Sequence, residues 1–309
     1  MEIFKLIPAY KDNLWGGTKL KTEWNKKTDL PVVAESWELS CHDAGLSVIE
    51  NGTFAGKTLK SVLTPAMLGK NAAHFPFFPV LIKLIDAKDN LSVQVHPSDD
   101  YALKNEGEYG KTEMWYVVDA EPGAGLYCGL KQDLTEAEFR KKIADKTLVE
   151  ALQFFPVKPG DAFFIPSGTV HAIGAGVTIC EIQQNSNLTY RVYDYGRVDK
   201  KTGKERELHV EKALKVADLT VYRDRIVPKE ERAGVSLLAS CNYFTVRRLA
   251  QPAAGAVTAD ENSFLSLTAL SGAGTIAGLP YRKGDTFFLP AGFGKAEITG
   301  ESVWIETRV

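Results

Sequence analysis

The stretch VKPGDAFFIPSGTVH, residues 157–171, predicts a turn, a buried strand and a second turn that ends in one histidine. Gly160 and Asp161 are typical turn residues, and the apolar run 162–165 suits a strand that is buried on both faces. Pro166, Ser167 and Gly168 then end this strand. The segment therefore presents His171 at the tip of a rigid structure.

The stretch RKGDTFFLPAGFGK, residues 282–295, repeats this pattern at an offset of 124 residues, with six identical residues in register. Such spacing predicts two copies of one β-sandwich. We expect a catalytic domain over residues 1–232 and a smaller β domain over residues 233–309. Lys295 replaces His171 in the second copy, and an ammonium cannot donate the neutral nitrogen that a metal needs. We therefore expect the C-terminal copy to be metal-free and structural.

Two further pairs of strands are predicted before this stretch. The apolar segments 77–85 and 91–95 flank a turn cluster, which predicts a hairpin. The segments 113–119 and 126–130 predict a second hairpin in the same way. Because side chains alternate along a strand, Ser92, Gln94 and His96 should share one face.

Three helical regions are predicted within this mainly β pattern, in addition to a short helix after Pro97 that Ser98, Asp99 or Asp100 can cap and that runs through Lys104. Apolar residues at helical spacing indicate a short helix within residues 58–68, and residues 208–219 form the last predicted helix. Thr135 and Glu138 form a capping box at the start of one or two helices within residues 134–152. Short strands and loops are expected over residues 1–55.

The composition is that of a globular chain without a strong charge. The 309 residues include 37 basic and 39 acidic side chains, which leaves a formal charge of -2 and no bulk attraction to nucleic acid or to an anionic membrane. No signal peptide or long apolar run is visible, so we expect a cytoplasmic protein. The four cysteines are far apart and form no CxxC pair, which argues against disulfides and thiolate metal sites.

Several motifs carry a specific resemblance. The spacing G-x5-P-x-G-x2-H from Gly160 to His171 resembles the second motif of cupins, which are small antiparallel barrels that hold a metal. QVHP at 94–97, KTEMW at 111–115 and QQNSNLTYRVYD at 183–194 resemble type I mannose-6-phosphate isomerases in their short bacterial form. The likeness covers most of residues 10–215, and it implies a mainly β, double-cupin fold with a few short helices.

A metal site is the first consequence of this resemblance. His96, Glu113 and His171 offer nitrogen and oxygen donors that suit Zn2+ with one position left for a substrate. Spacing alone leaves open that the histidines are packing residues and that Glu113 is exposed. The resemblance makes these three residues and Gln94 the ligands of one zinc ion per chain. The amide of Gln94 is a weak donor, however, and could instead bind the substrate.

The resemblance also implies the catalytic residues. It assigns Arg191, Lys111 and Glu181 to the active site, with Arg191 in a loop after the strand that carries Glu181. The residues themselves leave open a stacking or salt-bridging role for Arg191 and a solvated position for Lys111. Ser92 and Asn187 are expected to face the substrate, and Asn187 stands where some longer family members carry Asp. His42, His74 and His209 have no comparable neighbours in the sequence.

The implied activity is metal-dependent aldose–ketose isomerisation of mannose 6-phosphate and fructose 6-phosphate via an enediol(ate). A metal would stabilise charge on O1 and O2 of the substrate as a Lewis acid. Two alternatives stay open: an Fe(II) cupin oxygenase, because two histidines and a carboxylate also form a facial triad, and a non-catalytic sugar-phosphate sensor. The sensor would need a partner surface, and no helix-turn-helix or basic stripe is visible. The sequence sets neither the oligomeric state nor the proton-transferring residue.

Overall fold

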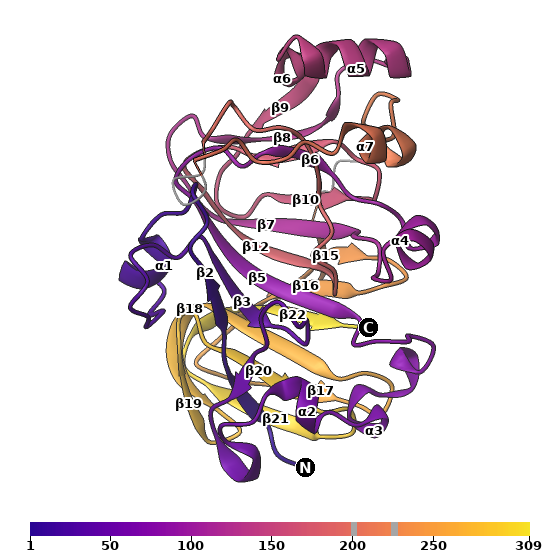
Figure 1. Ribbon diagram of the computed structural model, residues 1–309. Coiled ribbons are helices and arrows are strands. Elements are labelled where there is room, and N and C mark those ends of the chain that lie inside the picture. The colour runs from indigo at the N-terminus through magenta and orange to yellow at the C-terminus, as the bar shows by residue number, and fades with distance from the viewer. Residues whose placement is uncertain (199–202, 224–227) are drawn as a thin grey trace.

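The structure is a computed structural model that describes residues 1–198, 203–223 and 228–309. Antiparallel strands dominate it, so the predicted fold class, mainly β with a few short helices, is confirmed. Two β units are stacked, with the C-terminal strands in one unit and most of the preceding strands in the other (Figure 1). None of the described helices is long and apolar enough to cross a membrane.

The first unit consists of two sheets. One has six strands in the spatial order β10 (Ala162–Ile165), β7 (Glu113–Ala120), β12 (Val177–Gln184), β5 (Val80–Ala87), β3 (Glu35–Leu39) and β2 (Ala9–Lys11). The other has five, in the order β13 (Tyr190–Tyr193), β6 (Val93–Val95), β11 (His171–Ile173), β8 (Gly125–Leu130) and β9 (Leu152–Pro156). An apolar core between these sheets includes Trp115, Leu126 and Phe163.

The second unit is built on one eleven-stranded sheet. Its main path is β14 (Lys229–Arg232), β15 (Val235–Ser240), β16 (Thr245–Gln251), β22 (Ser302–Arg308), β18 (Leu265–Ile276), β20 (Thr286–Leu289), β1 (Phe4–Ile7) and β4 (Val48–Ile49). Strands β17 (Ala254–Ala259), β19 (Leu279–Arg282) and β21 (Gly294–Thr299) branch from this path. The division at residue 232 stays a prediction, but β1 pairs with β20, so the N-terminal strand lies in the C-terminal sheet.

The six-stranded sheet is buried on both faces. On β10, Phe163 and Ile165 lie in the core shared with the five-stranded sheet, whereas Ala162 lies in a core shared with the C-terminal unit. This is the alternation expected for a strand without a solvent face. The apolar run 162–165 therefore separates two cores, as the sequence predicted.

The two repeated stretches adopt the same backbone structure. Strands β10 and β20 begin two residues after Gly160 and Gly284, whose φ angles are 97° and 91°. In each copy the aspartate that follows this glycine, directly before the strand, accepts a hydrogen bond from the backbone N–H three residues earlier, at 2.9 Å and 3.0 Å. The repeat is thus structural, and Lys295 is exposed in an ion pair with Glu297.

Both predicted hairpins are wrong. Strand β5 pairs with β12 and β3, whereas β6 pairs with β11 and β13 in the other sheet. Likewise, β7 pairs with β10 and β12, and β8 pairs with β11 and β9. The turn clusters are real, but they carry the chain across the sandwich to the opposite sheet. There β8 buries Leu126 in the core between the sheets, whereas β6 buries Val93 and Val95 beneath the helices.

Short helices lie in the three predicted regions. Residues 58–68 hold α2 (Leu59–Val62) and α3 (Pro65–Leu68), which are separate because the residue before Pro65 is extended. The capping box of Thr135 and Glu138 opens α5 (Glu136–Ala144), and α6 (Leu148–Ala151) follows. The region 208–219 holds α7 (Val210–Val216). The short helix predicted after Pro97 is confirmed as α4 (Asp99–Asn105). A further helix is α1 (Lys19–Thr22), and short 3-10 turns span Gly52–Phe54 and Lys70–Ala72.

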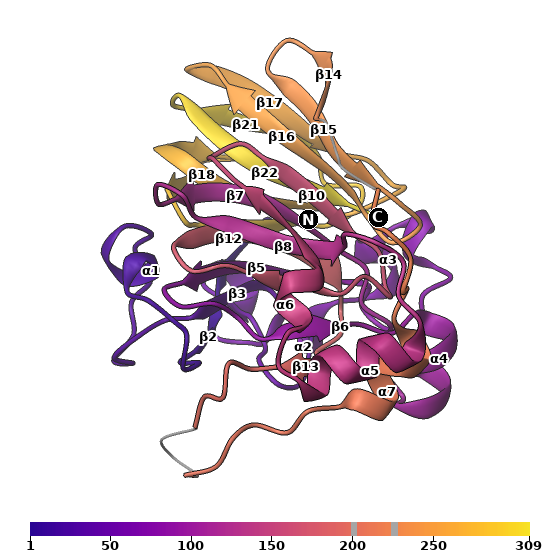
Figure 2. The same ribbon diagram turned by 90° about the horizontal axis from the view of Figure 1, so that it is seen from above.

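Helices α5, α6 and α7 cover the outer face of the five-stranded sheet (Figure 1). Phe139 and Leu148 of these helices pack with Val93, Val95 and Ala172 of the sheet. Figure 2 shows α4, α5 and α7 together at the end of the molecule opposite to β14 and β17. The five-stranded sheet is therefore enclosed between helices and the six-stranded sheet.

One buried ion pair joins the two units. Lys26 Nζ lies 2.6 Å from Glu38 Oε1, and both side chains are at most 5% exposed. Thr286 of the C-terminal unit donates a hydrogen bond to Glu38 Oε2 at 3.0 Å, and Lys26 donates one to the carbonyl of Gly284. A charged pair in an apolar interface needs such additional partners.

Glu38→Gln should destabilise the protein by about 3–5 kcal/mol, because it leaves the ammonium of Lys26 buried without a counter-charge. Urea unfolding followed by circular dichroism measures the effect. Glu261→Gln is the matched control, since Glu261 pairs with Lys70 on the surface and both side chains are more than two-thirds exposed. Its unfolding midpoint should equal that of the wild type. Equal midpoints for both variants would show that the buried pair is not important for stability.

Candidate metal centre and active site

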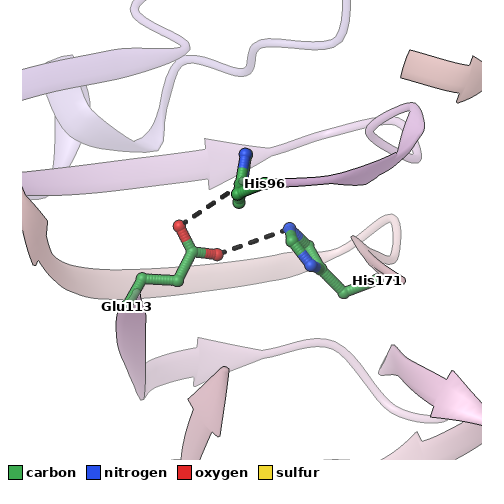
Figure 3. A group of neighbouring side chains, drawn as sticks. All are labelled: His96, Glu113 and His171. Atoms are coloured by element: carbon green, nitrogen blue, oxygen red, sulfur yellow. Dashed lines mark ion pairs between the residues drawn. The ribbon is translucent and has the colours of Figure 1, made fainter. Parts of the chain in front are cut away.

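Three strand ends bring His96, Glu113 and His171 together. His96 follows β6 directly, Glu113 is the first residue of β7, and His171 is the first residue of β11. One ligand atom of each lies within 4.8 Å of the other two. Glu113 Oε2 is 3.6 Å from His96 Nε2, and Glu113 Oε1 is 3.4 Å from His171 Nε2 (Figure 3). The site therefore spans both sheets of the first unit.

Backbone carbonyls fix the orientation of both imidazole rings. The Nδ1 atom of His96 is 2.8 Å from the carbonyl oxygen of Leu188, and the Nδ1 atom of His171 is 2.8 Å from that of Thr169. Each Nδ1 must therefore carry the proton, and each Nε2 is left with a free lone pair. This arrangement is typical of metal-binding histidines. It directs both Nε2 atoms toward Glu113.

The surroundings keep the histidines neutral. Burial and then the charge of Lys111 hold the pKa of His96 well below its usual range, and the same two causes lower the pKa of His171 to about 3. Burial raises the pKa of Glu113, and the charge of Glu181 adds to this effect. A bound dication would favour the ionised form of Glu113 instead. The site thus combines two neutral nitrogen donors with a carboxylate that lacks a sufficient counter-charge.

The three residues fit a divalent metal ion. Glu113 Oε1 is buried and has no hydrogen-bond partner among the described residues. Two donors that each lie about 2 Å from one ion at a tetrahedral angle are about 3.3 Å apart, close to the separations found here. Of the described residues, only this group of three or more His, Cys, Asp or Glu side chains has a suitable geometry. A metal would satisfy the orphaned oxygen.

Gln94 reaches the same point from β6. Its Nε2 atom lies 3.5 Å from His96 Nε2 and 3.4 Å from His171 Nε2. Rotation of the amide by 180° exchanges the two terminal atoms and directs Oε1 toward these nitrogens. Gln94 can therefore act as a fourth oxygen donor or bind a substrate beside the metal. Its role as a ligand stays a prediction.

Two buried lysines and a carboxylate adjoin the metal centre. Lys111 contacts Glu113 Oε2 and lies 3.1 Å from His96 Nε2, so the alternative of a solvated lysine is wrong. Glu181 Oε2 is 3.2 Å from Lys83 Nζ, and Glu181 Oε1 accepts a hydrogen bond from Trp115 at 3.0 Å. Burial raises the pKa of Glu181, but the charges of Lys111 and Lys83 outweigh it and lower the pKa overall. Glu181 is therefore an ionised anchor for both ammonium groups.

A cavity of about 310 Å³ opens beside these residues. It brings together predicted site residues that are far apart in the sequence: Ser92, Gln94, Lys111, Glu181, Asn187 and Arg191. A larger cavity of about 640 Å³ is mainly apolar and is lined by neither Gln94 nor Lys111, the two residues that contact the candidate ligands. The smaller, polar cavity is thus the candidate active site.

Known proteins resemble this chain over nearly its whole length. Residues 3–122 match the catalytic-domain model of type I phosphomannose isomerases. The probable mannose-6-phosphate isomerase GmuF of Bacillus subtilis (strain 168) is 39% identical over 308 residues, which cover 96% of this chain and 95% of the relative. The chain belongs to the type I mannose-6-phosphate isomerases.

Other members of this family support the same assignment. The mannose-6-phosphate isomerase of Streptococcus mutans is 38% identical over 284 residues, which cover 90% of this chain and 89% of the relative. The crystal structure of the mannose 6-phosphate isomerase from Bacillus subtilis superposes with a TM-score of 0.92 at 34% identity and covers both chains completely. The resemblance stated from the sequence motifs is therefore confirmed.

Two expectations about the site of this family member need correction. Arg191 lies in strand β13, opposite Gln94 of β6, and not in a loop. His209 does have chemically relevant neighbours, because it lines the cavity and its Nδ1 accepts a hydrogen bond from the backbone N–H of Arg191 at 3.2 Å. His209 lies directly before α7, and this helix packs against β13 at the edge of the five-stranded sheet.

Sequence reasoning missed four ionisable residues that line the cavity: Glu35, Lys83, Arg206 and His209. Lys83 had a usable signal, because it interrupts the apolar run 80–85 of strand β5, and a buried charge needs a specific partner. Arg206 gives no such signal. Only the return of the chain to β13 places it beside the cavity.

His171→Ala should release the metal from this family member. We expect the affinity for zinc to fall more than about 100-fold, because the loss of an outer-shell partner alone costs about 10- to 100-fold. Native mass spectrometry of the purified protein measures bound metal. His74→Ala is the control, since His74 is exposed and stacks on Phe75. Stoichiometric metal in His171→Ala would remove this residue from the ligand set.

Proposed function

We propose that the protein interconverts mannose 6-phosphate and fructose 6-phosphate, and that it uses one zinc ion per chain. The observation that carries this proposal is the cluster of His96, Glu113 and His171 at a polar cavity, in a chain of this isomerase family. We further propose a double-cupin architecture and a cytoplasmic location. None of the four cysteines, all of which lie in the described residues, forms a disulfide, and three of them are buried, which suits a reducing compartment.

The donor set favours zinc. Two neutral imidazoles and one carboxylate, with Gln94 as a weaker fourth donor, are typical of zinc sites that keep a position for substrate. When bound, zinc would act as a Lewis acid toward negative charge on the substrate's O1 and O2. His96, Glu113, His171 and Gln94 are thus the proposed ligands.

Lys111 is proposed to stabilise the charge that develops during the reaction. Moving a proton between C2 and C1 of the sugar places negative charge on O1 and O2, as in an enediol(ate). Lys111 Nζ lies within contact distance of Glu113 and 3.1 Å from His96, so its ammonium lies at the metal centre. A fixed cation in a water-poor site stabilises such charge strongly, because little reorganisation is needed.

Glu181 is proposed to hold this cation in place. It lies 3.9 Å from Lys111 Nζ and 3.2 Å from Lys83 Nζ, and its pKa is lowered overall, which makes it a poor proton donor. Its carboxylate can keep the ammonium groups of Lys111 and Lys83 oriented. Because all three groups are buried, separating these charges would cost free energy. This role differs from proton transfer and agrees with its position in the cavity wall.

Ser92, Asn187 and Arg191 are proposed to bind the substrate. Ser92 shares the strand face of Gln94, with 3.4 Å between Ser92 Oγ and Gln94 Oε1. Asn187 is exposed at the cavity edge, and Arg191 is paired with Gln94 across the sheet. Together they offer donors for hydroxyl groups and for an anion on the side of the cavity next to the metal centre.

Exhaustive chelation should abolish turnover of mannose 6-phosphate, and added zinc should restore it. A coupled assay that follows fructose 6-phosphate measures both steps. Full activity after chelation would contradict the zinc mechanism, whereas no turnover with zinc restored would contradict the substrate. Oxygen uptake that depends on the substrate would instead indicate an Fe(II) oxygenase.

Lys111→Gln should lower kcat by about 10²- to 10³-fold, because a preorganised charge next to the reacting oxygens is lost. Steady-state kinetics with the zinc-loaded variant measures the change. Lys88→Gln is the matched control, since Lys88 is exposed at the end of β5. An unchanged kcat in Lys111→Gln with unchanged zinc content would exclude Lys111 from the chemistry.

A further inference from the structure

A buried carboxylate next to the cavity holds two guanidinium groups. Asp194 directly follows β13, and its side chain is only 5% exposed. Arg206 donates two hydrogen bonds to it, from Nε to Oδ2 at 2.8 Å and from Nη2 to Oδ1 at 2.6 Å. Arg197 contacts Asp194 Oδ1 and also donates to the carbonyl of Asn90 at 2.6 Å. Two cations thus share one anion, which leaves an excess positive charge.

A strained turn maintains this arrangement. Tyr195 and Gly196 have φ angles of 58° and 66°, and the backbone N–H of Arg197 donates to the carbonyl of Asp194 at 3.1 Å. A positive φ angle is accessible to glycine but unfavourable for tyrosine. Such backbone strain persists only where the surrounding structure imposes it. The turn returns Arg197 to Asp194 Oδ1, whereas the fork of Arg206 contacts both oxygens of this carboxylate.

The two arginines differ in what they face. Arg206 lines the cavity, together with Arg191 and His209, whereas Arg197 is not among the cavity residues. The bidentate contact with Asp194 occupies Nε and Nη2 of Arg206, so Nη1 is left for a further partner. Arg206 is therefore a preoriented cation at the cavity wall.

Arg191 has unused hydrogen-bonding capacity at the same place. Its Nη1 donates to the carbonyl of Glu207 at 3.2 Å, but its buried Nε has no partner among the described residues. Burial and then the charge of Arg206 lower the pKa of Arg191, which indicates that the two guanidiniums are close enough to repel each other. An anion between them would remove this repulsion and satisfy the buried donor.

The distance from this cluster to the metal centre suits a sugar phosphate. In the five-stranded sheet, His171 is paired with Gln94, and Gln94 with Arg191, so the three lie in one row. Neighbouring strands are about 4.8 Å apart, which puts Arg191 about two strand spacings from His171. A six-carbon chain can span this separation, with the carbonyl end at the metal centre and its other end at the sheet edge.

We propose that Arg206, held by Asp194, binds the phosphate group of the substrate at the edge of the sheet. This inference rests on the proposed function, and it adds a residue that distinguishes a phosphorylated sugar from a neutral one. Its guanidinium would donate to the phosphate oxygens through Nη1 while Asp194 prevents it from moving away. Arg206 is thus a binding residue and takes no part in proton transfer.

Arg206→Gln should raise the KM for mannose 6-phosphate about 10- to 100-fold and leave kcat within about threefold, because a charge-assisted contact made equally in the ground and transition states is lost. The inhibition constant of inorganic phosphate should rise by a similar factor. Arg206→Lys keeps the charge but not the fork, so it should give a smaller increase in both. Steady-state kinetics on zinc-loaded protein measures these values.

Arg197→Gln is the matched control. It removes a neighbouring cation and a contact with Asp194, but Arg197 does not line the cavity. Its KM and phosphate inhibition constant should stay within about twofold of the wild type. Equal losses in Arg197→Gln and Arg206→Gln would show that Arg206 acts only through the fold. If Arg206→Gln fails to fold, Arg206→Lys decides, since wild-type constants in that variant would overturn the inference.

Two measurements separate this inference from the proposed function. If the wild type isomerises mannose 6-phosphate and Arg206→Gln has the same KM as the wild type, the phosphate site is contradicted but the proposed function is not. Titration calorimetry with inorganic phosphate tests the site without turnover. Phosphate binding that is lost in Arg206→Gln would support the site even if the wild type failed to isomerise the sugar.

Discussion

The burial of Glu113 is the constraint around which the site is arranged. A carboxylate without solvent exposure is unstable as an anion unless nearby cations and hydrogen bonds compensate for it. Lys111 supplies part of this compensation, and two imidazoles that are kept neutral point their lone pairs at the same place. Neutral imidazoles do not balance the charge, and a metal cation among the three residues would supply the remaining compensation. The metal site is thus a consequence of burying this residue between two sheets.

Comparison of the two repeated stretches distinguishes the residues that form the turn and strand from the residue that can bind a metal. Glycine at positive φ, the aspartate that closes the turn and the following apolar strand occur in both copies and have the same hydrogen bonds. At the end of the second copy, Lys295 is exposed and pairs with Glu297, whereas His171 is buried beside Glu113. The core of the C-terminal unit includes Phe287 and Trp304 and is apolar. Of the two copies, the first places a nitrogen donor at the candidate metal centre.

Local sequence patterns predicted the positions of the strands and helices better than they predicted which strands pair with each other. The run 162–165 was predicted to be buried on both faces because alternation and turn residues are local properties, and the Thr135–Glu138 capping box was recognised for the same reason. Strand partners depend on which sheet receives the chain after a turn, so both hairpins were wrong. In the site, His96 and Glu113 lie at strand ends within recognisable motifs. Arg206 and His209 reach the cavity only through tertiary contacts that no local pattern encodes.

The N-terminal strands connect the two units, and β1 pairs with a strand that lies near the other end of the sequence. Strand β1 pairs with β20, with Phe4 opposite Phe288, while β2, which begins after Pro8, pairs with β3 in the six-stranded sheet. During synthesis on the ribosome, β1 must therefore wait for nearly the entire chain before its partner emerges. The outer face of the six-stranded sheet is likewise uncovered until the C-terminal strands are made. Folding of the first unit is thus coupled to completion of the chain, and an unfinished chain leaves one apolar face of the six-stranded sheet uncovered.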